Sequence, residues 1–259
     1  MADGSSPLFE CWRKLERGKE HLKALNSGID AFLKSNPYQP VLHYDTKAAR
    51  YLVKFAAERP LPQTEWVLII GDCVHNLRTS LDYMAWRLAG SDRTDRDTMF
   101  IICKTPDAFK SREWRLKRLS DEAFAFVDGL QPYQRSNPKL NRLWVLEELD
   151  IGDKHKLLAT TQAVHEGAHI TCDDPFPLTI PFVNVGKFGP DTIISELITP
   201  FREKMEVQFH GSFDIVFDKG VLEVGAIRVR GSLEELAEAI DRILVEAERR
   251  IETVPGFSK

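Results

Sequence analysis

The sequence predicts an α+β protein, in which a helical N-terminal part packs with a C-terminal antiparallel sheet and a closing helix. Apolar residues recur at helical spacing over residues 7–157, whereas short alternating or β-branched segments dominate after Gly152. A final amphipathic helix follows these segments. The order helices, strands, helix is typical of the α+β class. We expect residues 7–157 and 158–253 to form one compact unit.

The first segment predicts an amphipathic helix over residues 7–35, followed by a hairpin. The apolar stripe of this helix consists of Phe9, Trp12, Leu15, Leu22, Leu25, Ile29 and Phe32. The turn residues Asn36 and Pro37 end the helix. Residues 41–45 and 49–57 then fit two strands, although the second segment also fits a helix.

The central helix is expected between Thr64, which fits an N-cap, and Gly90, which fits a C-terminal stop. Its apolar stripe consists of Trp66, Ile70, Cys73, Leu77, Leu81, Met84 and Leu88. Its opposite face consists of Asp72, Asn76, Thr79, Tyr83 and Trp86, with His75 and Asp82 at the edge. Because this face has no Lys or Glu, we expect other parts of the protein to cover it and its polar groups to be hydrogen-bonded.

The remaining elements follow from apolar periodicity and turn residues. A short apolar run lies at 99–103, and helices are expected over 106–119, 121–129 and 138–151, with a turn at 131–133. Strands are expected at 157–164, 169–172, 178–185, 192–198, 205–217 and 221–230. Ser232 and Glu235 form a capping box, which predicts the start of a last helix that continues to Ile251.

The composition excludes several classes of protein. A formal net charge of −4 gives no overall attraction to nucleic acid or to an anionic membrane. The four cysteines form no Cys-x-x-Cys pair, which excludes a zinc ribbon or thioredoxin motif. No apolar run is as long as a membrane span, and the first residues lack the features of a signal peptide. We therefore expect a cytoplasmic protein with reduced thiols and no membrane partner, compatible with a homo-oligomer.

Two segments carry candidate site residues. Asp72 and His75 lie three residues apart on the central helix, so their side chains can reach one point, as in helical metal sites. The segment from Glu147 to Lys156 combines carboxylates with His155, and Glu147, Asp150 and Lys154 share one side of its helix. Both segments also have a structural interpretation, as a hydrogen-bond network around His75 and as a charged helix end.

The two segments together predict a joint site. If their helices pack, Asp72, His75, Asp153 and His155 converge, and two carboxylates with two imidazoles suit a divalent transition metal. The same groups also suit a metal-free acid–base cluster, with His75 or His155 as the titrating group. Arg78 and Asp82, four residues apart, fit an ion pair along their own helix.

The pattern Gly71-Asp72-x-x-His75-Asn76-Leu77-Arg78-x-x-Leu81-Asp82, followed by Asp153-Lys154-His155, resembles one found in a group of uncharacterised bacterial proteins. This resemblance covers the two motif segments and implies no activity. A looser similarity is to HEPN ribonucleases, which cleave RNA with an Arg and a His separated by a short spacer. At the corresponding spacing from Arg78, this chain has Tyr83 instead of His.

Three functional hypotheses follow. The first is a hydrolytic enzyme acting on a small molecule, with catalytic residues among Asp72, His75, Arg78 and His155 and a metal site formed by Asp72, His75, Asp153 and His155. The second is the HEPN-like ribonuclease of a defence or toxin system that the resemblance implies, with Arg78 acting with His75 or Tyr83 on RNA. The third is a non-catalytic binding or regulatory protein, in which the motif is a structural polar network.

Overall fold

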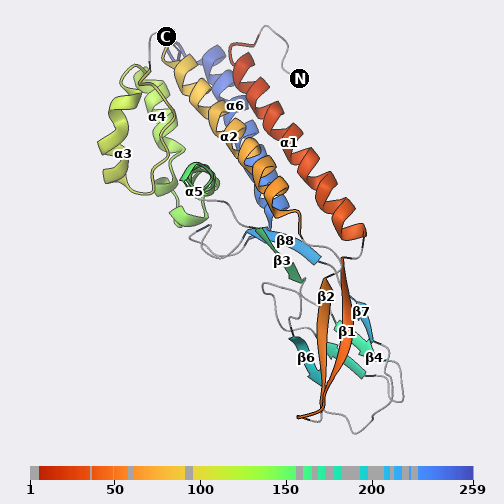
Figure 1. The fold of residues 1–259 in the computed structure, drawn as a ribbon. Helices are drawn as coiled ribbons and strands as arrows, with labels where there is room; N and C mark the ends of the chain where they lie inside the picture. The colour runs from red at the N-terminus through yellow and green to blue at the C-terminus, as the bar shows by residue number, and fades with distance from the viewer. Residues whose placement is uncertain are drawn as a thin grey trace. The chain divides into compact units, whose positions relative to one another are not determined.

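A computed structural model gives the fold of the chain, which belongs to the α+β class (Figure 1). The structure describes residues 6–35, 37–48, 50–57, 61–90, 96–155, 160–164, 169–172, 178–181, 193–197, 207–210, 213–217, 222 and 227–258. Contacts divide the chain into two units. The first consists of residues 1–25, 64–159 and 219–259, and the second of residues 26–63 and 160–218.

The helices of the first unit follow the predicted positions closely. They are α1 (Phe9–Lys34), of which residues up to Leu25 belong to this unit, α2 (Gln63–Leu88), α3 (Pro106–Arg112), α4 (Asp121–Gly129), α5 (Arg142–His155) and α6 (Val229–Thr253). Short 3-10 turns are η1 (Glu113–Leu116), η2 (Pro132–Gln134) and η3 (Pro138–Leu140). Thr105 and Ser120 cap α3 and α4 by accepting backbone N–H bonds from the first turn.

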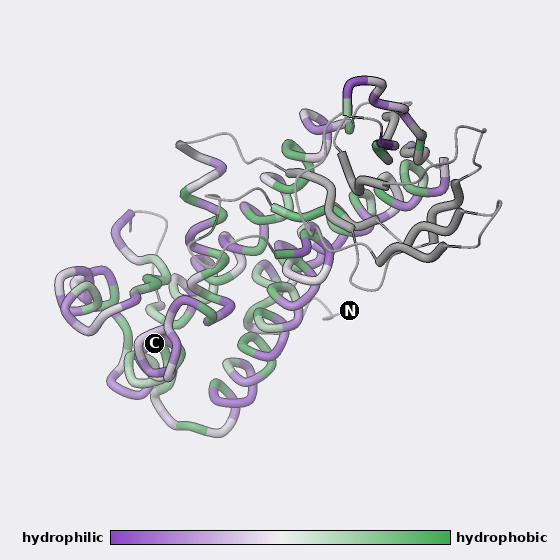
Figure 2. Tube along the Cα trace, turned by 90° about the horizontal axis from the view of Figure 1, so that it is seen from below, coloured by the Kyte–Doolittle hydropathy of each residue, from purple (hydrophilic) through white to green (hydrophobic). Residues whose placement is uncertain are grey.

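The long helices α1, α2 and α6 lie side by side and enclose the core of the first unit (Figure 1). The apolar stripe of α2 is buried as predicted, and Leu77 and Leu81 are fully inaccessible to solvent. Along each helix, apolar and polar residues alternate within the turns, as expected for helices with one buried side (Figure 2). At the edge of the core, Lys19 of α1 forms an ion pair with Asp241 of α6 at 2.9 Å.

The second unit is built from short antiparallel strands. The hairpin of β1 (Tyr38–Asp45) and β2 (Arg50–Ala57) pairs Tyr38 with Ala57, and β2 also pairs with β6 (Ile193–Leu197). A second sheet has the order β5 (Leu178–Pro181), β4 (His169–Cys172), β7 (Val207–His210), and β3 (Thr160–Val164) pairs with β8 (Phe213–Phe217). The hairpin reading of residues 41–57 is therefore confirmed.

The units divide the chain differently from the expected ranges 7–157 and 158–253. Helix α6 contacts α5, so the last helix belongs to the first unit although it follows the strands in sequence. The β1–β2 hairpin pairs with β6 and contacts β7, so it belongs with the strands although it lies between two helices. Hydrophobic periodicity indicates whether a segment is a helix or a strand. The element that it packs against depends on contacts between residues that are distant in sequence.

Several predicted helix ends are wrong. Helix α2 starts at Gln63, so Thr64 lies inside it and is not its N-cap, and α5 starts at Arg142 rather than at residue 138. The last helix starts at Val229, with Arg228 as its N-cap, so residues 229–230 are helical rather than extended, and Ser232 is buried inside the helix instead of capping it. The backbone N–H of Ser232 donates to the carbonyl of Arg228, which leaves no role for a capping box. Helix α5 also continues through Gly152 to His155, beyond the expected end at Ile151.

Within the described residues, no helix combines the length and apolar character that crossing a membrane requires.

A small residue sets the distance between α1 and α2. A Cβ atom at Gly18 would lie 2.9 Å from Cδ2 of Leu77 and 3.4 Å from the carbonyl oxygen of Cys73. Leu77 is fully buried, so its side chain has little room to move away.

We expect Gly18→Ala to lower the free energy of unfolding by about 1–3 kcal/mol, the usual cost of overpacking, despite the better helix propensity of Ala. Gly231→Ala in α6 is the matched control, because a Cβ there meets nothing within 4 Å. Urea denaturation of both variants measures the effect. A Gly18→Ala protein as stable as Gly231→Ala would contradict the close approach.

Candidate functional site

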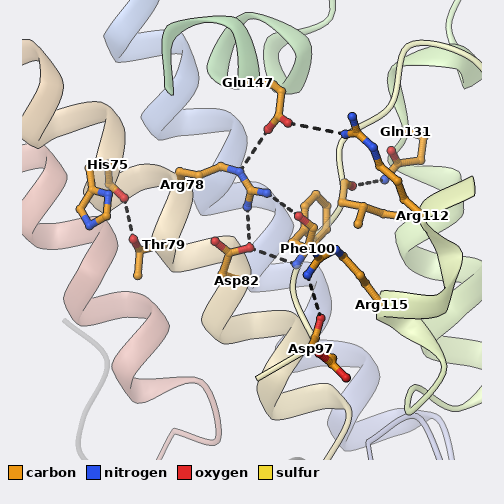
Figure 3. Close-up of polar contacts among 11 residues, drawn as sticks. His75, Arg78, Thr79, Asp82, Asp97, Phe100, Arg112, Arg115, Gln131 and Glu147 are labelled. Carbon is orange, nitrogen blue, oxygen red and sulfur yellow. Dashed lines mark hydrogen bonds and ion pairs between the residues drawn. The ribbon is translucent and has the colours of Figure 1, made fainter. Parts of the chain in front are cut away.

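Arg78 of α2 is a polar side chain with several hydrogen-bond partners in the first unit. It is buried, and its guanidinium contacts three groups from different parts of the chain (Figure 3). Its Nη1 donates to Asp82 at 2.7 Å, its Nε donates to Glu147 of α5 at 3.3 Å, and its Nη2 donates to the carbonyl of Phe100. The predicted pairing of Arg78 with Asp82 is confirmed, and Arg78 also joins α2 to α5.

Side chains satisfy the backbone of the apolar run at 99–103. This segment is neither helix nor strand. The N–H of Phe100 donates to Asp82 at 3.0 Å, while its carbonyl accepts from Arg78. Buried Gln131 continues this pattern, because its Nε2 donates to the carbonyl of Ile101 and its Oε1 accepts from the N–H of Cys103, both at 2.9 Å. The backbone of this run is therefore hydrogen-bonded as in a strand, but its partners are side chains.

Burial changes the acidity of the carboxylates around Arg78. The side chain of Glu147 is only 13% exposed, and desolvation raises its pKa although Arg78 acts in the opposite direction. Desolvation likewise raises the pKa of Asp82, against the attraction of Arg78. Asp150, one turn after Glu147 on α5, is also buried. Asp82, Glu147 and Asp150 surround Arg78, and we call these four residues the floor.

A cleft of about 480 Å³ opens above this floor. Arg78, Asp82, Glu147 and Asp150 line it from below, and Met99 and Phe100 line it from the segment at 99–103. Further lining residues are Ile101, Ile102, Arg112, Trp114, Arg115 and Ile151. Arg112 has a side chain 53% exposed and lies 4.0 Å from Glu147, whereas Arg115 lies over the Trp114 ring at 4.4 Å. We call the part of the cleft lined by Arg112 and Arg115 the rim; Figure 3 shows Arg112 beside Glu147 and Arg115 beside Asp97.

The two helices that carry the sequence motifs converge, as predicted. Besides the Arg78–Glu147 pair, a Cβ at Gly71 would lie 2.7 Å from Cγ of Asp153, so the Asp153 carboxyl lies against the α2 backbone. Arg78 and Asp82 follow Gly71 by seven and eleven residues, about two and three helical turns, so all three lie on one stripe of α2. This stripe, rather than the face around Asp72, is the one that α5 covers.

The prediction that the polar face of α2 is covered is wrong. Asp72 and His75 are exposed, and Tyr83 is 41% exposed. Polar side chains of this face bond to the preceding turn of their own helix: Asn76 donates to the carbonyl of Asp72, and Thr79 donates to that of His75, both at 2.8 Å. Asn76 also accepts a hydrogen bond from Nζ of Lys14 on α1 at 3.4 Å, so the polar groups of this face bond partly to their own helix and partly to α1.

The predicted site residues do not all meet in one place. Figure 3 shows the His75 ring pointing away from Arg78 and Glu147. Asp153 lies against Gly71, whereas the side chain of His155 lies outside the described residues. Among the described residues, no three His, Cys, Asp or Glu side chains are grouped to hold a metal ion. The four-residue metal site therefore stays a prediction.

The sequence reasoning missed several residues of the cleft. Gln131 stands in an expected turn, and Arg112, Trp114 and Arg115 lie in the basic run 110–118, whose pattern fits either a solvated helix face or contacts with phosphate groups. Trp114 within that run was the available signal, because a large aromatic among charges is typical of a binding surface. Comparisons with protein-family models, with curated proteins and with solved structures find no match to this chain.

Removing the Arg78 guanidinium is expected to destabilise the fold strongly. Arg78→Met leaves Asp82 and Glu147 as buried carboxylates without their cation and leaves the Phe100 carbonyl without its donor. We expect a loss of about 3–5 kcal/mol in the free energy of unfolding, measured by urea denaturation. Arg17→Met is the control, because Arg17 forms an exposed ion pair with Glu20, and water and salt screen such a pair so that it contributes little to stability. Equal losses in the two variants would refute a special role for Arg78.

The raised pKa of Glu147 predicts how stability depends on pH. The folded state holds the Glu147 proton more tightly than the unfolded chain does, so ionisation at high pH opposes folding. Wild type should lose stability relative to Glu147→Gln as the pH rises from the ordinary glutamate pKa of 4.5 through the raised value. Above that value the difference should stay constant. A difference that grows in favour of wild type over this range would show that the pKa is lowered instead.

Proposed function

We propose that this protein is a binding module for small anionic molecules, with the cleft above Arg78 as its binding site and the motif residues as its structural support. The observation that carries this proposal is the separation of charges within the cleft. The side chains of Glu147 and Asp82 are 13% and 28% exposed and Asp150 is buried, whereas the side chain of Arg112 is 53% exposed. An incoming ligand therefore meets Arg112 first.

The chemistry of the rim suits an anion. A guanidinium presents several N–H donors in a planar fork that matches the oxygens of a phosphate or carboxylate. Arg112 is the last residue of α3 and Arg115 lies in the following 3-10 turn, over the exposed Trp114 ring. Arg78 offsets one of the three floor carboxylates, and the raised pKa values of Asp82 and Glu147 favour their neutral forms, which reduces the negative charge that an anion meets there.

The arrangement favours binding over the two catalytic hypotheses. A catalytic arginine must reach its substrate, but the guanidinium of Arg78 is buried and bonded to three protein groups. Exposed His75 points away from the cleft (Figure 3). Hydrolysis and RNA cleavage stay predictions, and Glu147 is the group that either would use here, since a raised pKa in a cleft suits acid–base work.

Inorganic phosphate is the simplest probe of the proposal. We expect phosphate, but not chloride at equal ionic strength, to raise the melting temperature in a concentration-dependent manner. Arg112→Gln should weaken phosphate binding about tenfold, the effect of losing one charge-assisted hydrogen bond. Isothermal titration calorimetry measures both affinities.

The exposed Arg17→Gln is the matched control and should bind phosphate like wild type. Equal affinity of Arg112→Gln and Arg17→Gln would place the phosphate elsewhere. No response of wild type to phosphate would overturn the proposed function.

A further inference from the structure

We infer that the ligand of this cleft is a nucleoside phosphate, whose phosphate binds at Arg112 and Arg115 and whose base binds in a second, aromatic cleft beside it. This inference rests on the proposed function and specifies its ligand class. It follows from a second cavity of about 440 Å³ on the other side of Met99. That cavity is lined by Glu10, Asp82, Tyr83, Trp86, Arg87, Arg96, Thr98 and Met99.

The second cleft has the character of a ring-binding site. Tyr83 and Trp86 stand three residues apart on α2, so their rings lie on neighbouring turns of one helix face. Tyr83 is 41% exposed and Trp86 is half-buried, so both rings are available at the surface of the cleft. Aromatic side chains of this kind bind flat rings by stacking, which contributes to the binding of any nucleic-acid base.

The charges of the second cleft are arranged to leave it close to neutral. Arg87 forms an ion pair with Glu10 at 2.6 Å and lies 5.6 Å from the centre of the Trp86 ring. The hydrogen bond from Arg87 lowers the pKa of Glu10, so that carboxylate stays ionised and keeps Arg87 engaged. The Glu10–Arg87 pair is neutral and Arg96 adds a cation to the lining, so this cleft suits a flat ring through Tyr83 and Trp86 rather than through its charges.

The two clefts share a wall formed by Asp82 and Met99. Asp82 is fixed by Arg78 and by the N–H of Phe100, whereas Met99 carries a flexible side chain that adapts to what contacts it. A ligand that lies across Met99 places one end among aromatic rings and the other between rim arginines. Nucleoside phosphates combine a flat base with a phosphate, separated by a sugar, and so match both ends.

Three ligands test this inference on the intact protein by isothermal titration calorimetry: inorganic phosphate, adenosine and adenosine monophosphate. We expect adenosine monophosphate to bind about tenfold more tightly than phosphate, because stacking of the base adds to the phosphate contacts. Trp86→Leu keeps an apolar side chain but removes the flat ring. It should abolish this preference while phosphate binding stays within about twofold of wild type, which also shows that the variant is folded.

The outcomes separate the two proposals. If phosphate binds but adenosine monophosphate binds no more tightly, the ligand is not a nucleoside phosphate, although the cleft still binds anions. The same conclusion follows if Trp86→Leu keeps the preference for adenosine monophosphate. If neither phosphate nor adenosine monophosphate binds, the proposed function itself fails. If a 5′-phosphorylated adenylate hexamer binds more tightly than the monophosphate, a free nucleotide is the wrong ligand.

Discussion

The buried guanidinium of Arg78 is the interaction on which the first unit depends. It pairs with both Asp82 and Glu147, and with Asp82 it binds both backbone groups of Phe100. Three parts of the chain meet there: α2, α5 and the segment at 99–103. Buried charges are stable only when they are paired and hydrogen-bonded, so these groups constrain one another's positions. The floor of the cleft is a consequence of this constraint.

The sequence predicts local structure well because the signals are local. The apolar stripe of α1 and that of α2 follow helical spacing, and Asn36-Pro37 stands where α1 has ended. The start of α6 was misplaced because Ser232 and Glu235 match a capping box, whereas the helix extends three residues upstream. Which unit contains α6 or the β1–β2 hairpin depends on contacts between distant residues, and one sequence carries no such signal.

The candidate site was predicted in part. The Arg78–Asp82 pair follows from their spacing of four, and the packing of the two motif helices follows from their shared composition. Periodicity placed the covered face of α2 around Asp72, but α5 packs over Gly71, where a residue without a side chain permits close approach. The roles of Gln131 and Arg112 could not be derived, because each acts on a segment far away in sequence.

The low charge of α2 now has a physical explanation that requires no further covering element. One stripe faces the core, where Leu77 meets Gly18 of α1, and a second stripe, with Gly71 and Arg78, faces α5. Tyr83 and Trp86 line the aromatic cleft. The strip with Leu68, Asp72 and His75 is exposed to water. A helix used on three sides has few positions at which Lys or Glu would be tolerated, and its composition reflects that use.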